Sequence, residues 1–175
     1  MNIYKNFNEI EYNPNTILTV GTFDGVHRGH QLIIDKLLEM SNRENLRHLI
    51  LTIDPHPQIV LNKVDRKQIF LLTTIDERLK LFQSNGIENV LIIPFSIEFA
   101  KTDAKDFIVD YLVKKIGLRT LLIGYDHLFG KNRQGNESLL TDLSKEYNFQ
   151  IEKISAFLEK ELIISSTKIR NLILS

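Results

Sequence analysis

The order of apolar and amphipathic segments is the feature that most restricts the fold of this 175-residue chain. Short apolar runs alternate with longer amphipathic segments, a pattern typical of repeated strand-helix units whose strands form a parallel sheet. The runs expected to be buried strands are residues 16–21, 47–54, 89–95, 120–126 and 151–154. The sequence therefore predicts an α/β fold with a mainly parallel sheet of about five strands and helices on both faces.

The segments that separate these strands have the periodicity of helices that bury one face. Residues 103–117 begin with acidic side chains and end with paired lysines and a glycine, which suits the helix macrodipole. The other expected helices are residues 30–40, 74–85, 138–148 and 166–174. The pattern is weak between residues 59 and 73, which we expect to be irregular.

The composition argues against several classes of function. Lys plus Arg and Asp plus Glu each total 22, so the net charge is zero and no electrostatic footprint for nucleic acid or an anionic membrane is present. The chain has no cysteine, which excludes disulfides, thiolate zinc sites and cysteine nucleophiles. The N-terminus lacks the pattern of a signal peptide, and no apolar run has the length of a membrane span. We expect one compact cytoplasmic domain, residues 1–175, that binds neither nucleic acid nor a membrane.

Residues 21–30, GTFDGVHRGH, stand where the first strand passes into the first helix. Ligands of open parallel sheets bind at the carboxyl ends of strands, where a helix N-terminus presents free amides to an anion. The spacing of Gly21, Gly25 and Gly29 fits neither the dinucleotide-binding motif nor the Walker motif. A dinucleotide-binding fold and a Walker NTPase are therefore disfavoured.

His27 and His30 lie three residues apart in the first helical turn, so both imidazoles can face one ligand. Gly29 between them leaves room for phosphate oxygens to approach the backbone. This arrangement suits the reacting phosphate of a nucleotide, because displacement at phosphorus needs positioning and charge neutralisation rather than a protein nucleophile. Two alternatives stay open at this point: capping or surface histidines, and a metal site formed by His27, His30 and His56.

HRGH resembles the HxGH signature of the nucleotidylyltransferase superfamily. Residues 19–31, TVGTFDGVHRGHQ, are similar to the adenylyltransferase module of bacterial bifunctional FAD synthetases. Three further stretches match that family in the same order, namely TIDPHPQ (52–58), LLIGYDHLFGKNRQG (121–135) and ISSTKIR (164–170). The resemblance implies a Rossmann-like nucleotidylyltransferase fold and transfer of AMP from ATP to FMN by direct in-line displacement, giving FAD and pyrophosphate. It also implies that Mg²⁺ is carried by the ATP phosphates, without protein side chains as metal ligands.

The resemblance places ATP where the GTFDGVHRGH and SSTKIR segments converge. The histidines would stabilise charge at the α-phosphate and the leaving pyrophosphate, the amides of Thr22 and Phe23 would line the site, and the SSTKIR segment would hold the β- and γ-phosphates. The expected catalytic residues are His27, His30, Ser166 and Arg170. The expected ATP-binding residues are Gly21, Thr22, Phe23, Asp24, His27, Gly29, His30, Gly124, Ser165, Ser166, Thr167 and Arg170. Without the family, the SSTKIR segment also fits a helix cap with a solvated arginine, and Asp24 fits an Asx-turn.

The same resemblance assigns the flavin side of the site to the segments that follow two strands. Prolines restrict the backbone of the DPHP segment, and Phe129 is placed to pack on a flat ring system. An ordinary turn and simple loop anchoring are the alternatives for these two features. The second loop departs from the family pattern, because His127 and Leu128 stand where an aromatic residue and an arginine are common. The expected flavin-binding residues are Pro55, His56, Pro57, Asp126, Phe129 and Arg133.

The chain ends at Ser175, directly after the arginine motif, without the riboflavin kinase domain that normally follows in this family. We therefore expect no conversion of riboflavin to FMN by this chain, and such a domain is the partner that the resemblance implies for a full-length protein. Two other functions stay open. One is a related transferase whose acceptor is nicotinamide mononucleotide, phosphopantetheine or a phospho-alcohol, and the other is a flavin- or nucleotide-binding module with little turnover.

Overall fold

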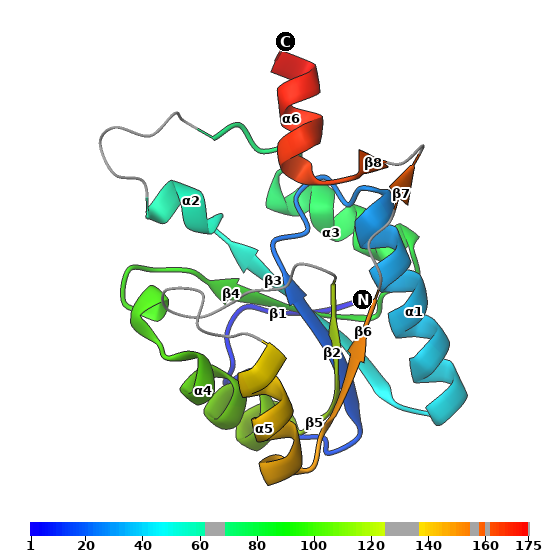
Figure 1. Ribbon diagram of the computed structural model, residues 1–175, viewed down its shortest axis with the longest axis vertical. Helices are drawn as coiled ribbons and strands as arrows, with labels where there is room; N and C mark the ends of the chain where they lie inside the picture. Colours follow the sequence, from blue (N-terminus) through cyan, green and yellow to red (C-terminus); the bar gives the residue numbers. More distant parts are fainter. Residues whose placement is uncertain (62–68, 125–136, 155–157, 160–161, 175) are drawn as a thin grey trace.

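The computed structural model describes residues 1–61, 69–124, 137–154, 158–159 and 162–174 (Figure 1). Its centre is a parallel sheet of six strands: β1 (Asn2–Tyr4), β2 (Thr16–Gly21), β3 (Arg47–Asp54), β4 (Asn89–Pro94), β5 (Leu118–Ile123) and β6 (Gln150–Lys153). The strands hydrogen-bond in the order β1-β4-β3-β2-β5-β6. The predicted α/β class and parallel sheet are confirmed.

Strand β1 is the sixth strand, which the sequence pattern did not predict. It has three residues and pairs with β4 alone, with Ile3 opposite Val90. The N–H of Asn2 donates to the Glu88 carbonyl at 2.6 Å. Three residues carry too little periodicity to be read as a strand, so tertiary pairing decides this element.

The helices that separate the strands agree with the predicted positions within a few residues. They are α1 (Arg28–Glu44), α3 (Ile75–Ser84), α5 (Glu137–Tyr147) and α6 (Ser166–Leu174). The helix predicted at 103–117 consists of a short turn, α4 (Ala104–Asp106), and a π-helix, η2 (Phe107–Ile116). Besides β1, the elements not predicted are α2 (Pro57–Val60), η1 (Phe99–Lys101), β7 (Leu158–Glu159) and β8 (Leu162–Ile163), the last two forming an antiparallel pair. None of the helices in the described residues is long and apolar enough to cross a membrane.

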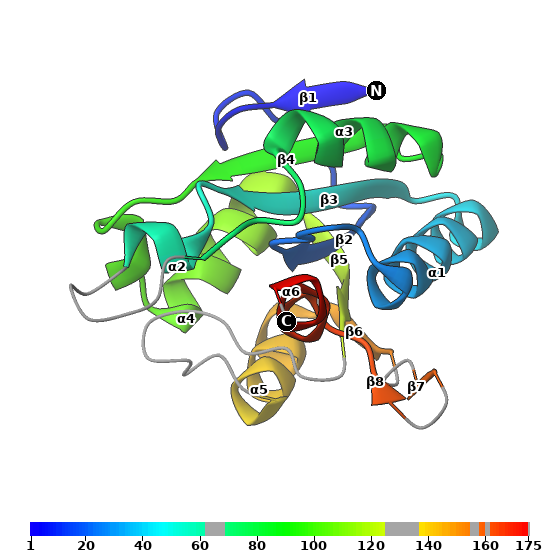
Figure 2. The ribbon, with the colours of Figure 1, turned by 90° about the horizontal axis from the view of Figure 1, so that it is seen from above.

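Helices cover both faces of the sheet because successive side chains of the central strands point to opposite sides. In β3, Leu49 and Leu51 belong to the core formed with η2 and α5, whereas Ile50 belongs to the core formed with α1 and α3. Figure 2 shows α1 on one side of the strands and α4 and α5 on the other. A strand that is buried on both faces reads as a continuous apolar run, which is the pattern seen in the sequence.

The strand order reverses at β2. From β2 the chain passes to β3 and β4 on one side, and then returns to place β5 on the other side of β2. In open α/β sheets such a reversal separates the loops at the carboxyl ends of the two strands and creates the usual ligand position. The segment after Gly21 and the residue Gly124 lie at this position, and α6 lies over the same end of the sheet (Figures 1 and 2).

Two glycines after helices allow a matched test of backbone packing. Gly117 and Gly86 both have a left-handed φ, +90° and +83°. A Cβ atom at Gly117 would overlap the backbone of Asn13, whereas at Gly86 it would meet Leu38 Cδ1 at 3.6 Å. We expect Gly86→Ala to lower the free energy of unfolding by about 1 kcal/mol and Gly117→Ala by about 3 kcal/mol or more. Urea denaturation measures both values, and equal losses would contradict the overlap at Gly117.

Candidate active site

The loop between β2 and α1 has an unusual backbone. Phe23, Gly25 and Val26 all have left-handed φ values, of 50°, 81° and 37°. Phe23 and Val26 are buried, and the ring of Phe23 meets that of Phe82 in α3 edge-on, with centroids 5.5 Å apart. Non-glycine residues adopt such angles only where the surrounding structure enforces them, and such residues cluster at functional sites. Packing beneath this loop therefore holds it in one shape.

His27 and His30 lie together at the start of α1, as the sequence predicted. Their rings are stacked, with centroids 3.7 Å apart and planes inclined by 16°. His27 is also the N-cap of α1, and its Nδ1 accepts the His30 backbone N–H at 3.4 Å. An accepting Nδ1 leaves the proton of the neutral His27 ring on Nε2. His27 thus caps α1 and stacks on His30 at the same time.

Burial keeps both imidazoles uncharged. Burial lowers the pKa of His30 to about 3, with smaller contributions from the neighbouring His27 and Arg78. Burial also lowers the pKa of His27, partly offset by the carboxylate of Asp24. Within the described part of the chain, the buried His30 Nδ1 has no hydrogen-bond partner. The pair therefore presents neutral imidazoles, one of which has an unused nitrogen.

Helix α6 brings the SSTKIR segment to this loop from far along the chain. Arg170 Nη1 lies 2.6 Å from Asp24 Oδ2, a contact between residues 146 positions apart. The Ser166 hydroxyl donates to the Asp24 carbonyl at 2.9 Å. Thr167 Oγ1 accepts from Arg170 Nη2 at 3.3 Å, and Ser165 Oγ accepts the Lys168 N–H at 3.4 Å. The segment caps its helix and also meets the loop that carries the histidines.

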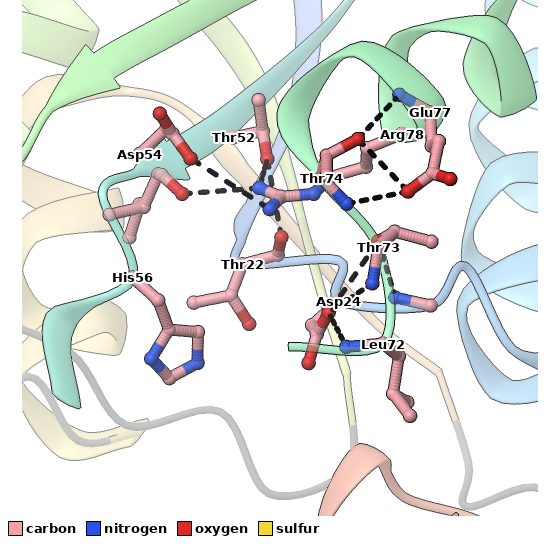
Figure 3. Close-up of polar contacts among 12 residues, drawn as sticks. Thr22, Asp24, Thr52, Asp54, His56, Leu72, Thr73, Thr74, Glu77 and Arg78 are labelled. Atoms are coloured by element: carbon pink, nitrogen blue, oxygen red, sulfur yellow. Dashed lines mark hydrogen bonds and ion pairs between the residues drawn. The ribbon is translucent and has the colours of Figure 1, made fainter. Parts of the chain in front are cut away.

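Asp24 joins three segments of the chain. Its carboxylate is fully buried, and Oδ1 accepts the backbone N–H groups of Leu72 and Thr73 at 2.8 and 3.1 Å (Figure 3). The Gly25 N–H in turn donates to Thr73 Oγ1 at 2.9 Å. Together with Arg170, these contacts direct the carboxylate at protein groups and make Asp24 an organiser of the loop.

Gly29 and Gly124 each lie close to a side chain. A Cβ atom at Gly29 would meet the His27 ring at 3.3 Å, and one at Gly124 would meet Ile33 Cδ1 at 3.4 Å. The absence of a side chain at Gly29 thus makes room for the ring of His27. The expected contacts of Gly21, Gly29 and Gly124 with ATP stay predictions.

The DPHP segment follows β3 at the same end of the sheet. His56 is buried and caps α2, with its Nδ1 accepting the Gln58 N–H at 3.1 Å. Burial lowers the pKa of His56, and the charges of Asp24, Arg170 and Arg78 also act on it. His56 therefore lies close enough to Asp24, in the loop before α1, for the two charges to interact. The remaining flavin-side predictions, Asp126, Phe129 and Arg133, lie outside the described residues, as do His127 and Leu128.

The metal alternative finds no support in the geometry. Among the described residues, no group of three or more histidine, aspartate or glutamate side chains is arranged to hold a metal ion. His27 and His30 stack on each other, and Nδ1 atoms of His27 and His56 accept backbone N–H groups. These histidines are therefore arranged as caps and hydrogen-bonding groups rather than as a three-histidine cage.

Sequence reasoning missed Arg78, the largest fully buried side chain of the described structure. Its Nη1 donates to Thr52 Oγ1 at 3.0 Å and to the Ile53 carbonyl at 3.2 Å, at the carboxyl end of β3 (Figure 3). Thr52 Oγ1 in turn donates to the Thr22 carbonyl at 3.3 Å. The available signal was an arginine four residues before Phe82, on the buried face of the predicted helix.

Comparison with known proteins shows the family to which the chain is similar. The family model described as FAD synthetase matches residues 9–168. A bifunctional riboflavin kinase/FMN adenylyltransferase of Buchnera aphidicola subsp. Schizaphis graminum is 37% identical over 163 residues, which are 93% of this chain and 52% of that protein. The protein of the same description from Escherichia coli is 36% identical over 154 residues, 88% of this chain and 49% of that protein.

A protein described as FAD synthetase from Listeria monocytogenes is 31% identical over 154 residues, 88% of this chain and 61% of that protein. The chain thus spans about half the length of the bifunctional relatives and somewhat more of this one. A crystal structure titled as a macrolide-efflux protein from Streptococcus pneumoniae is similar to this chain, with a TM-score of 0.83 and 24% sequence identity. The match covers 99% of this chain and 55% of the chain in that structure. This last likeness concerns the fold alone. From the family match over residues 9–168 we conclude that this chain belongs to the FAD synthetase family.

Proposed function

We propose that this chain is an FMN adenylyltransferase, which transfers AMP from ATP to FMN and releases FAD and pyrophosphate. The observation that carries the proposal is the contact between Arg170 of α6 and Asp24 of residues 21–30, which we call the histidine loop. This contact lies where the strand order of the sheet reverses, in a chain of the FAD synthetase family. A neutral pair of imidazoles beside a guanidinium is suited to polyphosphate, because it offers donors to the oxygens on which charge develops.

In the proposed reaction, an oxygen of the FMN phosphate attacks the α-phosphorus of ATP in line. The bond between the α-phosphorus and the oxygen bridging to the β-phosphate breaks, and pyrophosphate leaves with that electron pair. No covalent intermediate with the protein is required. His27 and His30 donate hydrogen bonds to the α-phosphate and the leaving group, as neutral imidazoles that need no protonation first.

The start of α6 holds the β- and γ-phosphates in this proposal. Ser165, Ser166 and Thr167 supply the free amides of a helix N-terminus, and Arg170 supplies the positive charge. The ion pair with Asp24 fixes the guanidinium in place before ATP arrives. Mg²⁺ would be carried by the ATP phosphates. There it would neutralise negative charge on the phosphates.

In this proposal, FMN binds at the residues that follow β3. Pro55, His56 and Pro57 follow that strand, and His56 lies within electrostatic reach of Asp24 and Arg170. FMN bound along this segment would bring its phosphate toward the histidine loop. The match to the FAD synthetase family supports FMN as the acceptor over the other phosphorylated acceptors.

Incubation of the protein with ATP, Mg²⁺ and FMN, followed by chromatography for FAD, tests the proposed function. We expect FAD to form, and His30→Ala to lower turnover about a hundredfold or more while circular dichroism stays unchanged, since it removes a preorganised donor. His48→Gln is the matched control, because His48 bonds Ser41 and the Glu88 N–H at the opposite end of β3. It should keep normal turnover. A His30→Ala rate within about threefold of the unmodified protein would remove this histidine from the mechanism.

The low pKa of His30 also predicts how stability depends on pH. A folded-state pKa of about 3, below the ordinary value near 6.5, means that the unfolded chain binds this proton first as the pH falls. The stability that neutral His30 provides is therefore complete above about pH 6.5 and declines toward pH 3. Between about pH 7.5 and pH 5, the unmodified protein should lose about 2 kcal/mol more stability than His30→Gln. Urea unfolding at both pH values measures this, and equal losses would refute the lowered pKa.

A further inference from the structure

We propose that Arg78 is a positioning residue for the reaction. It connects the loop assigned to ATP with the strand end assigned to FMN, and it holds the two at a fixed spacing. The inference rests on the proposed function, because the two segments are assigned to substrates there. Arg78 itself is fully buried in α3 and so acts through its neighbours.

The hydrogen bonds of Arg78 reach both segments. Nη1 donates to Thr52 Oγ1 and to the Ile53 carbonyl, at 3.0 and 3.2 Å. Through the Thr52 hydroxyl, which donates to the Thr22 carbonyl at 3.3 Å, the contact continues to the residue that follows β2. Nη2 faces Asp54 Oδ1 at 4.0 Å, directly before the DPHP prolines. Figure 3 shows the guanidinium between these groups.

Helix α3 holds Arg78 in a fixed place relative to the histidine loop. The helix begins with a capping box in which Thr74 Oγ1 accepts the Glu77 N–H and Glu77 Oε2 accepts the Thr74 N–H, at 3.3 and 2.8 Å. The residues just before it, Leu72 and Thr73, are bound by the Asp24 carboxylate. Because Arg78 follows the capping box directly, its backbone moves with the segment that Asp24 holds.

Stability alone does not account for an arginine at this position. Nε and Nη2 are buried without a hydrogen-bond partner among the described residues, and the ion pair with Asp54 is long. A buried charge with unmade hydrogen bonds is costly, and replacing such a group with an apolar side chain of similar size is often neutral or stabilising. Residues that cost stability are concentrated at functional sites. The charge of Arg78 also lowers the pKa of His30 and of His56, so it acts on both sides of the site.

A positioning role has a distinct kinetic signature. The attacking oxygen and the phosphorus must come within about 3.5 Å in line, and a misplacement of about 1 Å costs roughly a hundredfold in rate. Arg78 touches neither substrate in this proposal, so its loss should lower kcat and leave the two KM values close to normal.

Arg78→Met tests the proposal, because it keeps the length of the side chain and removes the guanidinium. We expect kcat for FAD formation to fall tenfold or more, roughly the cost of a partial misplacement. The KM values for ATP and FMN should change by less than about threefold, and the Tm should be unchanged or higher. Arg47→Met is the matched control. Arg47 bonds Thr16 Oγ1 and the Ile116 carbonyl at the other end of the sheet, so its loss should lower the Tm and leave kcat unchanged.

The outcomes separate this proposal from a purely structural role. A normal kcat for Arg78→Met would overturn it, and so would a large fall in Tm with a parallel loss of activity, or a raised KM for ATP with an unchanged kcat. Arg78→Lys keeps the charge but cannot bridge Thr52 and Asp54 with one planar fork, so it should recover only part of kcat. Full recovery would show that charge alone suffices and would also overturn the proposal.

A second measurement tests the role of Arg78 independently of whether the protein makes FAD. If the unmodified protein makes no FAD from FMN and ATP, the proposed function fails on its own. Amide hydrogen exchange then still tests Arg78, because the Arg78→Met variant should show faster exchange both in residues 22–25 and in residues 56–58. A change confined to one of these segments, or to neither, would show that Arg78 does not connect them.

Discussion

The site depends on the burial of one carboxylate. Asp24 is fully buried, and a buried charge is tolerated only when it is paired and hydrogen-bonded. Its partners come from two distant segments: Arg170 in α6, and the amides of Leu72 and Thr73 before α3. These segments have to meet at the β2-α1 loop for the charge to be compensated. The need to pair Asp24 therefore assembles a site from parts of the chain that share no strand.

The sequence predicted what depends on periodicity and local spacing. Buried strands on two faces read as apolar runs, and two histidines three residues apart on a helix face the same side, so β2 to β6 and the His27-His30 pair were foreseen. β1 and Arg78 were not, because each is defined by a partner distant in sequence. The pairing of Asp24 with Arg170 was not foreseen either, although both residues were placed in the same site.

Capping and ligand binding do not exclude each other for the histidines and serines. His27 accepts an amide of its own helix, and Ser165 does the same for α6. A helix N-terminus has several unpaired amides, and one side chain satisfies one of them. The others remain available for an anion, so a capped helix still suits phosphate. A cap in the sequence therefore does not argue against a site.

The division of charge within the site explains why neutral imidazoles suit it. The positive charge is carried by the guanidinium groups of Arg78 and Arg170. Burial and the nearby cation hold His30 in its neutral form. In the proposed reaction, Arg170 supplies the attraction for phosphate, while the imidazoles supply directed N–H groups without adding charge that would repel Arg78 or require solvation. An additional imidazolium at His30 would have to be buried beside an arginine that already lacks hydrogen-bond partners for two of its nitrogens within the described residues.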